Sequence, residues 1–282
     1  MPDKKKYRFY LIPPIREAGD DVVIELSKEQ RLPGYDSLKN LLDDIDWDLH
    51  TGPLRPSGFR PLGQREGFCF MAAARLPIVR EACESGKYNA IVLLGGADPG
   101  FTESREIAKH YNIPVTSCAF AQMHLASTLG NKFSIIDIAE AHNMVLYDLV
   151  VRYHFTQRCA SIKNIDTPLT KNLRPGEISI QKEQEKALRG EPSEAVERAV
   201  HEAVSAIEED GAEVITFGCS PSYWLRPFVE KGLNEMGWEI PVLEGYSCAI
   251  TLAKAMVDLG VDVSSLYLPG DHLERWRKKK VF

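Results

Sequence analysis

The residue with the clearest capacity for chemistry is Cys219, which follows a short apolar run in a turn of glycine, cysteine and serine. The run from Ala212 to Phe217 predicts a buried strand, and the Ser220-Pro221 pair predicts the start of a helix. A thiol at this junction meets the positive end of a helix and unpaired backbone N–H groups, which favour the thiolate. A thiolate there can remove a proton from carbon or return one. The pattern therefore predicts an acid–base role for Cys219.

A second stretch of the chain repeats the design around Cys219 but has glycine where the thiol would be. The apolar run from Asn89 to Leu94 ends at Gly95, and a helical segment then leads to Ile-Pro-Val at 113–115. The stretch after Cys219 likewise leads through a helical segment to Ile-Pro-Val at 240–242. Strand, glycine turn, helix and strand in each half predict two α/β lobes with a ligand site between them. We expect Cys219 on one side of that site and Gly95 on the other.

The remaining segments continue the alternation of strands and helices that predicts parallel sheets. The expected helices include one that is capped by Ser193, carries a single apolar stripe and ends at Gly211. Residues 51–67 are expected to form a long loop, and residues 170–194 a charged surface excursion. The other expected elements are strands at 7–12 and 133–138 and helices at 35–42, 72–85 and 140–153.

Composition narrows the class of protein. With 282 residues, 44% of them hydrophobic, the chain can bury a core large enough for two lobes. A formal net charge of -6 gives no reason to expect nucleic acid as a partner. We expect a cytoplasmic protein, because no apolar run is long enough to span a membrane and no signal peptide is evident at the amino terminus. The six cysteines form no C-x-x-C pair, so reduced thiols are expected and no metal site is predicted.

Five segments of the chain carry a family resemblance: Ala97–Gly100, Met123–Asp137, Val150–Ile162, Glu209–Cys219 and Ile240–Gly245. Together they resemble the hydantoin and allantoin racemase branch of the aspartate/glutamate racemase superfamily. The resemblance implies two flavodoxin-like lobes related by a pseudo-twofold axis, with parallel sheets and an active site in the cleft between them. It implies a first lobe of residues 1–112 plus 241–282 and a second lobe of residues 113–240. It also implies a reaction without a cofactor, in which one cysteine removes a proton and another supplies one on the opposite face.

Three departures from the family pattern bear on the reaction. Gly95 stands where the family has its first cysteine, Ile12-Pro13-Pro14 replaces an Asn-Pro-Asn turn, and Phe120 replaces a glutamate. One cysteine opposite a glycine resembles arylmalonate decarboxylase, in which a single thiol protonates the enolate left by loss of carbon dioxide. The leading interpretation is an isomerase acting on a small hydantoin-like or carboxylate carbon acid through Cys219. A decarboxylase and a non-catalytic binding protein stay open. A Cys219 pKa of about 8.5 or higher, measured from the alkylation rate against pH, would favour the binding protein.

Other polar groups near the two turns are candidates for substrate binding. Backbone amides of Gly96, Ala97 and Ser220, and of Cys118, are placed to bind a carboxylate or an enolate oxygen. Asp98 in its Asp-Pro-Gly turn suits a helix cap as well as a ligand contact. A small molecule is the expected partner, without nucleic acid or membrane, and a homo-oligomer stays open. The candidate substrate-binding residues are Gly95, Gly96, Ala97, Asp98, Ser117, Cys118, His124, Gly218 and Ser220.

Overall fold

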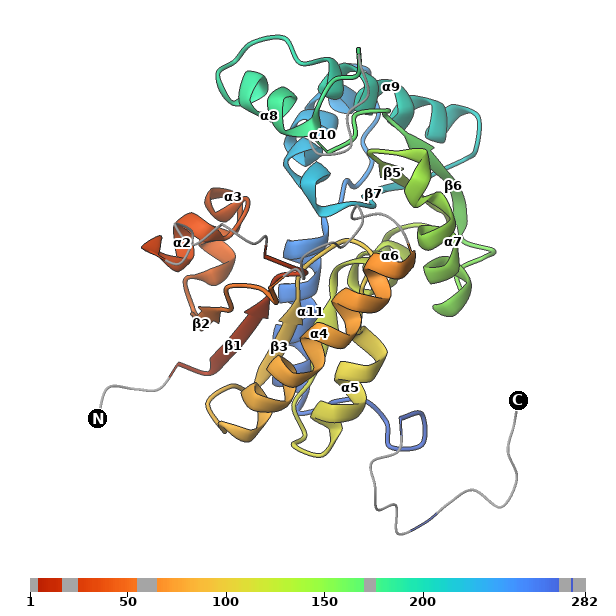
Figure 1. The fold of residues 1–282 in the computed structure, drawn as a ribbon. Helices are drawn as coiled ribbons and strands as arrows, with labels where there is room; N and C mark the ends of the chain where they lie inside the picture. Colours follow the sequence, from red (N-terminus) through yellow and green to blue (C-terminus); the bar gives the residue numbers. More distant parts are fainter. Residues whose placement is uncertain (1–4, 17–24, 55–64, 170–175, 269–274, 276–282) are drawn as a thin grey trace.

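The computed structural model describes residues 5–16, 25–54, 65–169, 176–268 and 275. They form two α/β lobes, each built on a parallel sheet, as the sequence predicted (Figure 1). The first sheet has the order β2-β1-β3-β4, with β1 at Tyr7–Ile12, β2 at Ile45–Leu49, β3 at Ala90–Leu93 and β4 at Val115–Ser117. The second has the order β6-β5-β7, with β5 at Phe133–Asp137, β6 at Cys159–Asn164 and β7 at Val214–Phe217.

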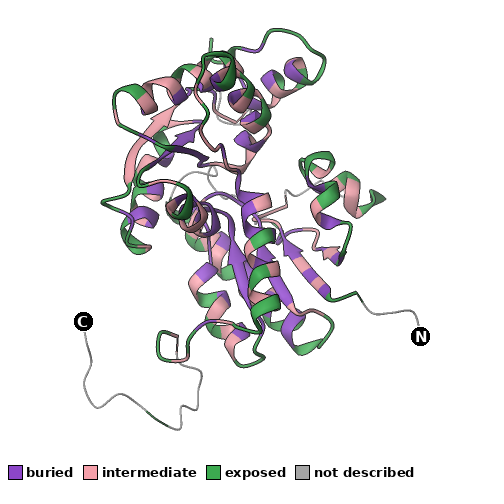
Figure 2. Ribbon diagram, turned by 180° about the vertical axis from the view of Figure 1, so that it is seen from behind, coloured by how far each residue is buried: buried purple, intermediate pink, exposed green. Residues whose placement is uncertain are grey.

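The first sheet is covered by helices on both faces, which is why β3, one of its two central strands, is apolar at every position. Ile91 and Leu93 of β3 pack in one cluster with α4 (Arg65–Glu84) and α5 (Phe101–Lys109). Val92 packs in another with α11 (Gly245–Leu259) and α3 (Tyr35–Leu42). The purple ribbons of Figure 2 show this burial running through the sheet.

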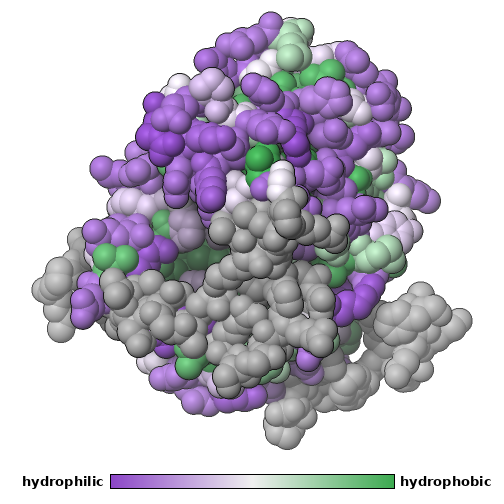
Figure 3. Space-filling view, turned by 45° about the horizontal axis from the view of Figure 1, so that its top comes forward, coloured by the Kyte–Doolittle hydropathy of each residue, from purple (hydrophilic) through white to green (hydrophobic). Residues whose placement is uncertain are grey.

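The second sheet is likewise enclosed by helices. Alanines of α9 (Glu194–Glu208) pack in one cluster with Ile136 and Phe217. The opposite cluster combines Ile135 with α6 (Cys118–Leu129) and α7 (Asn143–Arg152). The helix α10 (Arg226–Glu235) packs beside α9. Over this lobe, the surface visible in Figure 3 is mostly hydrophilic.

The chain crosses between lobes at positions that differ somewhat from the expected boundaries. Strand β4 pairs with β3, so the first sheet continues past residue 112 as far as Ser117. Val242 still bridges to Ile215 of the second sheet before α11 packs on β3 and β4. The first Ile-Pro-Val segment therefore leads into the edge strand β4, whereas the second adds a single bridge beside β7. The helices α6 and α11, in mutual contact, carry the chain between lobes.

Local signals in the sequence account for several helix boundaries. The Ser193 hydroxyl accepts a hydrogen bond from the Val196 N–H, which caps α9 as predicted. Helix α4 begins at Arg65, inside the expected loop, while residues 55–64 of that loop lie outside the described residues. The expected excursion contains α8 (Ile180–Leu188), and its residues 170–175 are likewise not described. Within the described ranges, no helix is both long and apolar enough to cross a membrane.

Candidate active site

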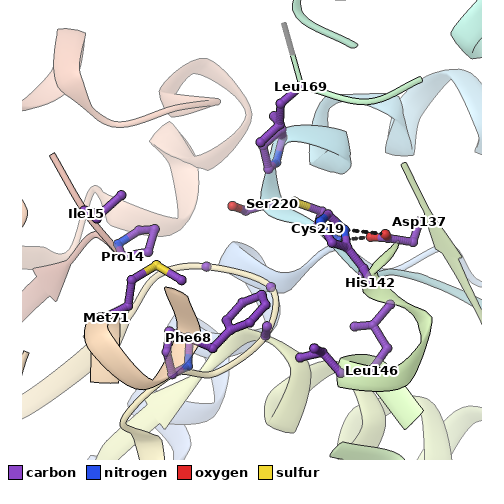
Figure 4. Close-up of a pocket in the computed structure, with 17 residues that line it drawn as sticks. Pro14, Ile15, Phe68, Met71, Asp137, His142, Leu146, Leu169, Cys219 and Ser220 are labelled. Atoms are coloured by element: carbon purple, nitrogen blue, oxygen red, sulfur yellow. Dashed lines mark hydrogen bonds and ion pairs between the residues drawn. The ribbon is translucent and has the colours of Figure 1, made fainter. Parts of the chain in front are cut away.

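A pocket lies between the two lobes, where β3, β5 and β7 end (Figure 4). It encloses about 670 Å³ of space, which includes its open mouth. Side chains from both lobes line it, and Cys219 lies on the wall that belongs to the second lobe. The lining residues are Pro14, Ile15, Phe68, Met71, Gly95, Gly96, Ala97, Pro99, Asp137, His142, Val145, Leu146, Leu169, Gly218, Cys219, Ser220 and Pro221.

Cys219 forms part of a cluster with Asp137 and His142. The backbone N–H of Cys219 donates to Asp137 Oδ1 at 2.6 Å, and Asp137 Oδ2 lies 2.7 Å from His142 Nδ1. One ligand-type atom from each of the three side chains lies within 4.8 Å of the others. Asp137 ends β5, whereas His142 ends the 3-10 turn Glu140–His142 and Cys219 follows β7. Three polypeptide segments of the second lobe thus bring a carboxylate, an imidazole and a thiol together in the pocket.

The surroundings of Cys219 make its ionisation harder than the sequence suggested. Cys219 is partly accessible from the pocket. Burial of the thiol and the nearby Asp137 charge raise its pKa well above the ordinary cysteine value, although the Ser220 backbone lowers it. The expected lowering of the pKa is therefore wrong. The sequence indicated the favourable turn amides but gave no sign of the carboxylate beside the thiol.

His142 responds in the opposite sense to the same carboxylate. Burial lowers the pKa of the imidazole, but the hydrogen bond and charge of Asp137 outweigh burial, and the net shift is upward. The three side chains are of types that also bind metal ions. Both Asp137 oxygens are already hydrogen-bonded, one to the Cys219 backbone N–H and the other to His142 Nδ1.

The wall contributed by the first lobe has a different character. Pro14, Ile15, Phe68 and Met71 give it an apolar surface, and the described lining residues of this lobe include no titratable side chain. Gly95 has a φ of +116°, and a Cβ at this position would lie 3.3 Å from Pro14 Cβ. The acid–base side chains that line the pocket in the described part of the chain therefore all come from the second lobe.

A buried arginine supports the wall of the first lobe from behind. The Arg75 guanidinium donates to the carbonyl oxygens of Ile12 and Pro99 at 3.1 Å each, and also to that of Leu94. Its Nε lies 3.3 Å from Pro13 O. Burial lowers the Arg75 pKa to about 10. Arg75 thus ties the turn after β1 to the turn after β3, which together carry the first-lobe wall.

Several residues that the sequence offered as ligands lie outside the pocket lining. Asp98 is 2% exposed and accepts bonds from the Ala119 and Phe120 N–H groups at 2.9 and 2.7 Å. It also accepts from Ser117 Oγ and from the Tyr153 hydroxyl. Asp98 therefore caps α6. This is the helix-cap role, one of the two roles that the sequence allowed for Asp98. Ser117 is fully buried beside it.

Cys118 and His124 also lie away from the pocket lining. Cys118 is fully buried at the start of α6, where burial raises its pKa well above the ordinary value. His124 packs against the Phe120 ring at 4.0 Å between centroids, and its Nδ1 lies 2.8 Å from the Phe120 carbonyl oxygen. The candidates that the structure does gather around the pocket are Gly95, Gly96, Ala97, Gly218, Cys219 and Ser220.

Comparison with known proteins agrees with this architecture. The family described as Asp/Glu/Hydantoin racemase matches residues 70–253. The chain belongs to this family. It is 30% identical over 202 residues to the hydantoin racemase of Paenarthrobacter aurescens, covering 71% of this chain and 75% of the relative. It is 29% identical over 194 residues to the hydantoin racemase of a Pseudomonas species, covering 68% of each chain. This membership identifies the chain as a racemase-family isomerase.

Solved structures show the same fold. Allantoin racemase from Klebsiella pneumoniae superposes with a TM-score of 0.64 at 20% identity, over 97% of each chain. Unliganded arylmalonate decarboxylase superposes with a TM-score of 0.52 at 12% identity, over 89% of this chain and 92% of the other. At these identities the likeness concerns the two-lobe fold alone.

Proposed function

We propose that this family member is a cofactor-independent racemase of a neutral, hydantoin-like carbon acid and that Cys219 transfers the proton. The observation that carries the proposal is the position of the Cys219 thiol on the wall of the inter-lobe pocket. A carbon-bound hydrogen next to a carbonyl group is acidic enough for such a transfer when the resulting enolate is stabilised. The backbone turn of Gly96 and Ala97, opposite Cys219, is our candidate for that stabilisation.

The lining of the pocket favours a neutral substrate over a carboxylate. Its described residues include no lysine or arginine that could pair with a carboxylate, and they include the acidic Asp137. Phe68, Met71 and Leu146 offer apolar contact instead. A hydantoin ring is uncharged, and an apolar substituent on its reactive carbon would gain from contact with these side chains.

A single thiol has to serve both faces of the reacting carbon in this arrangement. Cys219 takes the proton, the planar enolate turns over in the pocket, and the same thiol returns a proton to the other face. The apolar first-lobe wall supports this route because it holds the substrate without offering a competing acid. The route differs from the paired-cysteine mechanism that the resemblance implies, in which each face has its own thiol.

The test is a substrate panel followed by polarimetry and by carbon dioxide release. The panel contains hydantoins with apolar and with charged substituents, allantoin, free amino acids and substituted malonates. The proposal predicts loss of optical rotation without gas, fastest for hydantoins with apolar substituents. Gas release from the malonates without racemisation would instead indicate a decarboxylase, and binding without turnover would indicate a non-catalytic protein.

A further inference from the structure

We propose that His142, oriented by Asp137, accepts the proton of the Cys219 thiol, so that the three side chains form one proton relay. This inference deepens the proposed function, on which its role in the reaction rests. The relay is absent from the paired-cysteine scheme, in which each thiol acts from its own side of the substrate.

The geometry leaves one imidazole nitrogen of His142 for proton exchange. Nδ1 lies 2.7 Å from Asp137 Oδ2, so this nitrogen donates its hydrogen to the carboxylate. A neutral imidazole protonated at Nδ1 carries its free lone pair on Nε2. The pocket lining includes both His142 and Cys219, and Figure 4 shows the His142 ring beside Cys219 and Asp137. The bond to Asp137 therefore selects the tautomer that can receive a thiol proton.

The need for such an acceptor follows from the surroundings of the thiol. If Cys219 lost its proton to solvent, a second negative charge would form beside Asp137 in a largely buried site. If the proton moves to His142 instead, an imidazolium–thiolate pair forms and the net charge of the cluster stays the same. The cluster brings its ligand-type atoms within 4.8 Å of one another. In this largely buried site, opposite charges on the imidazolium and the thiolate stabilise one another more strongly than they would in water. The relay thus overcomes the unfavourable ionisation of the isolated thiol.

Within the described residues, two titratable groups lie beside His142. Asp137 reaches it from β5, and Cys219 lies beside it on the turn after β7. Val145 and Leu146 of α7 and Leu169, which line the same part of the pocket, are uncharged. Among the described residues, Asp137 is the charged group that shifts the His142 pKa. A pH dependence measured at this site therefore reports on the three members of the relay.

The proton transfers balance in each direction. The Cys219 S–H bond breaks, and the proton binds to Nε2 of His142, which becomes an imidazolium. The thiolate lone pair then forms a new S–H bond with the proton of the substrate carbon, and the electron pair of the C–H bond remains as the enolate. Return of the proton to carbon regenerates the thiolate. Transfer from His142 back to sulfur restores the starting state.

The test measures the alkylation of Cys219 as a function of pH, without substrate. Iodoacetamide is applied from about pH 5 to about pH 10.5, and the modified Cys219 peptide is quantified by mass spectrometry. We expect His142→Asn to move the midpoint upward by about one pH unit or more, which lowers the rate near pH 7 about tenfold or more. Exposed Cys69, followed in the same samples, should keep its profile.

A second variant separates the relay from a structural role of His142. In Asp137→Asn, the amide oxygen can still accept the Cys219 N–H, but the amide nitrogen presents hydrogens to His142 Nδ1. The imidazole then takes the other tautomer, with its proton on Nε2, and cannot accept from sulfur. Loss of the Asp137 charge also lowers the pKa of the thiol, so the alkylation midpoint of this variant should move less than that of His142→Asn. The decisive readout for Asp137→Asn is kcat, which we expect to fall on the order of a hundredfold or more with any substrate that the enzyme racemises.

An unchanged Cys219 alkylation profile in folded His142→Asn, with an unchanged melting temperature, would overturn the relay, and so would an unchanged kcat in folded Asp137→Asn. The result also distinguishes the relay from the proposed function. If the alkylation midpoint of Cys219 moves upward in His142→Asn but the wild-type protein racemises none of the hydantoins, the relay is retained and the proposed function is rejected. Racemisation by His142→Asn with the wild-type kcat and pH profile would reject the relay and retain the function.

Discussion

Gly96 of the first lobe lies directly against Gly218 of the second, because a Cβ on Gly96 would sit 1.7 Å from the Gly218 carbonyl oxygen. The same Cβ would sit 2.9 Å from the Cα of Cys219. No side chain fits between the two turns at this separation. The contact fixes how far the Gly95 turn stands from the thiol, and therefore the width of the pocket.

Replacing Gly96 with alanine should force the two turns apart. We expect Gly96→Ala to lower the unfolding free energy by about 1–3 kcal/mol, the usual cost of overpacking, and to reduce activity on the order of a hundredfold. The matched control is Gly190→Ala, where φ is +74° and no atom lies within 4 Å of the added Cβ. The free energy of unfolding of Gly190→Ala should fall by about 1–2 kcal/mol because of backbone strain alone, and this variant should keep its activity. Urea unfolding and racemisation assays check both variants, and equal activities would contradict the role given to the contact.

Removing the thiol should abolish proton transfer without disturbing the fold. We expect Cys219→Ala to reduce racemisation on the order of a hundredfold or more, with an unchanged circular dichroism spectrum. Cys69→Ala, at an exposed position on α4, should retain full activity. Cys83 and Cys159, which also lie outside the pocket lining, should tolerate alanine catalytically as well. A Cys219→Ala variant with most of the wild-type activity would remove the central role of this residue.

A thiol introduced at Gly95 should reach the opposite face of the substrate, but only if the backbone accepts it. The φ of +116° strains any L side chain, and Pro14 Cβ lies 3.3 Å from the new Cβ. We therefore expect Gly95→Cys alone to gain little, and Gly95→Cys with Pro14→Gly, which removes that Cβ, to raise racemisation by supplying a second acid. Gly95→Ala with Pro14→Gly carries the same backbone strain without the thiol. Similar racemisation by the two double variants would show that the thiol at 95 does not reach the substrate.

Arg75 should be important for stability, since it holds both first-lobe turns. Loss of its guanidinium in Arg75→Met removes the Arg75 donors to the buried carbonyl oxygens of Pro99 and Leu94, whereas that of Ile12 keeps the Leu94 N–H. Each unpaired acceptor lowers the free energy of unfolding by about 1–3 kcal/mol, so we expect Arg75→Met to lower it by about 3 kcal/mol or more in total. Arg80→Met, at an exposed position of the same helix, should stay within about 0.5 kcal/mol of the wild type. Equal unfolding midpoints in urea would contradict the role assigned to Arg75.

The place of Cys219 could be predicted from sequence because it depends on local signals. A buried run, a glycine and a Ser-Pro pair put the thiol between β7 and the following 3-10 turn. Asp137 and His142 were missed because their role depends on strand order. Strand β5 pairs with β7, with Ile136 opposite Phe217, and this pairing brings Asp137 beside Cys219. The available signal was an acidic residue at the end of a buried strand. The sequence alone does not show which residue of another strand lies beside it.

Asp98 illustrates the opposite limit of sequence reasoning. An Asp-Pro-Gly turn fits a ligand contact or a helix cap equally well, and the choice depends on which helix packs beside it. Here α6 follows β4, the immediate neighbour of β3, so its first N–H groups point at the Asp98 carboxylate. Burial raises the Asp98 pKa, although hydrogen bonds from Ser117 and the helix oppose that shift. The cost of burying the carboxylate is thus offset by local donors.

The most direct test of the single-thiol account follows deuterium exchange and inversion together in heavy water. One enantiomer of a substrate that the enzyme racemises is incubated with it, and loss of the carbon-bound proton by NMR is compared with loss of optical rotation. One thiol on one face can exchange the proton and return deuterium to the same face before the enolate turns over. The account therefore predicts that exchange outpaces inversion, with deuterium in the unreacted enantiomer as well as in the product. Deuterium found only in the inverted product would contradict it, because a second acid would then act from the opposite face.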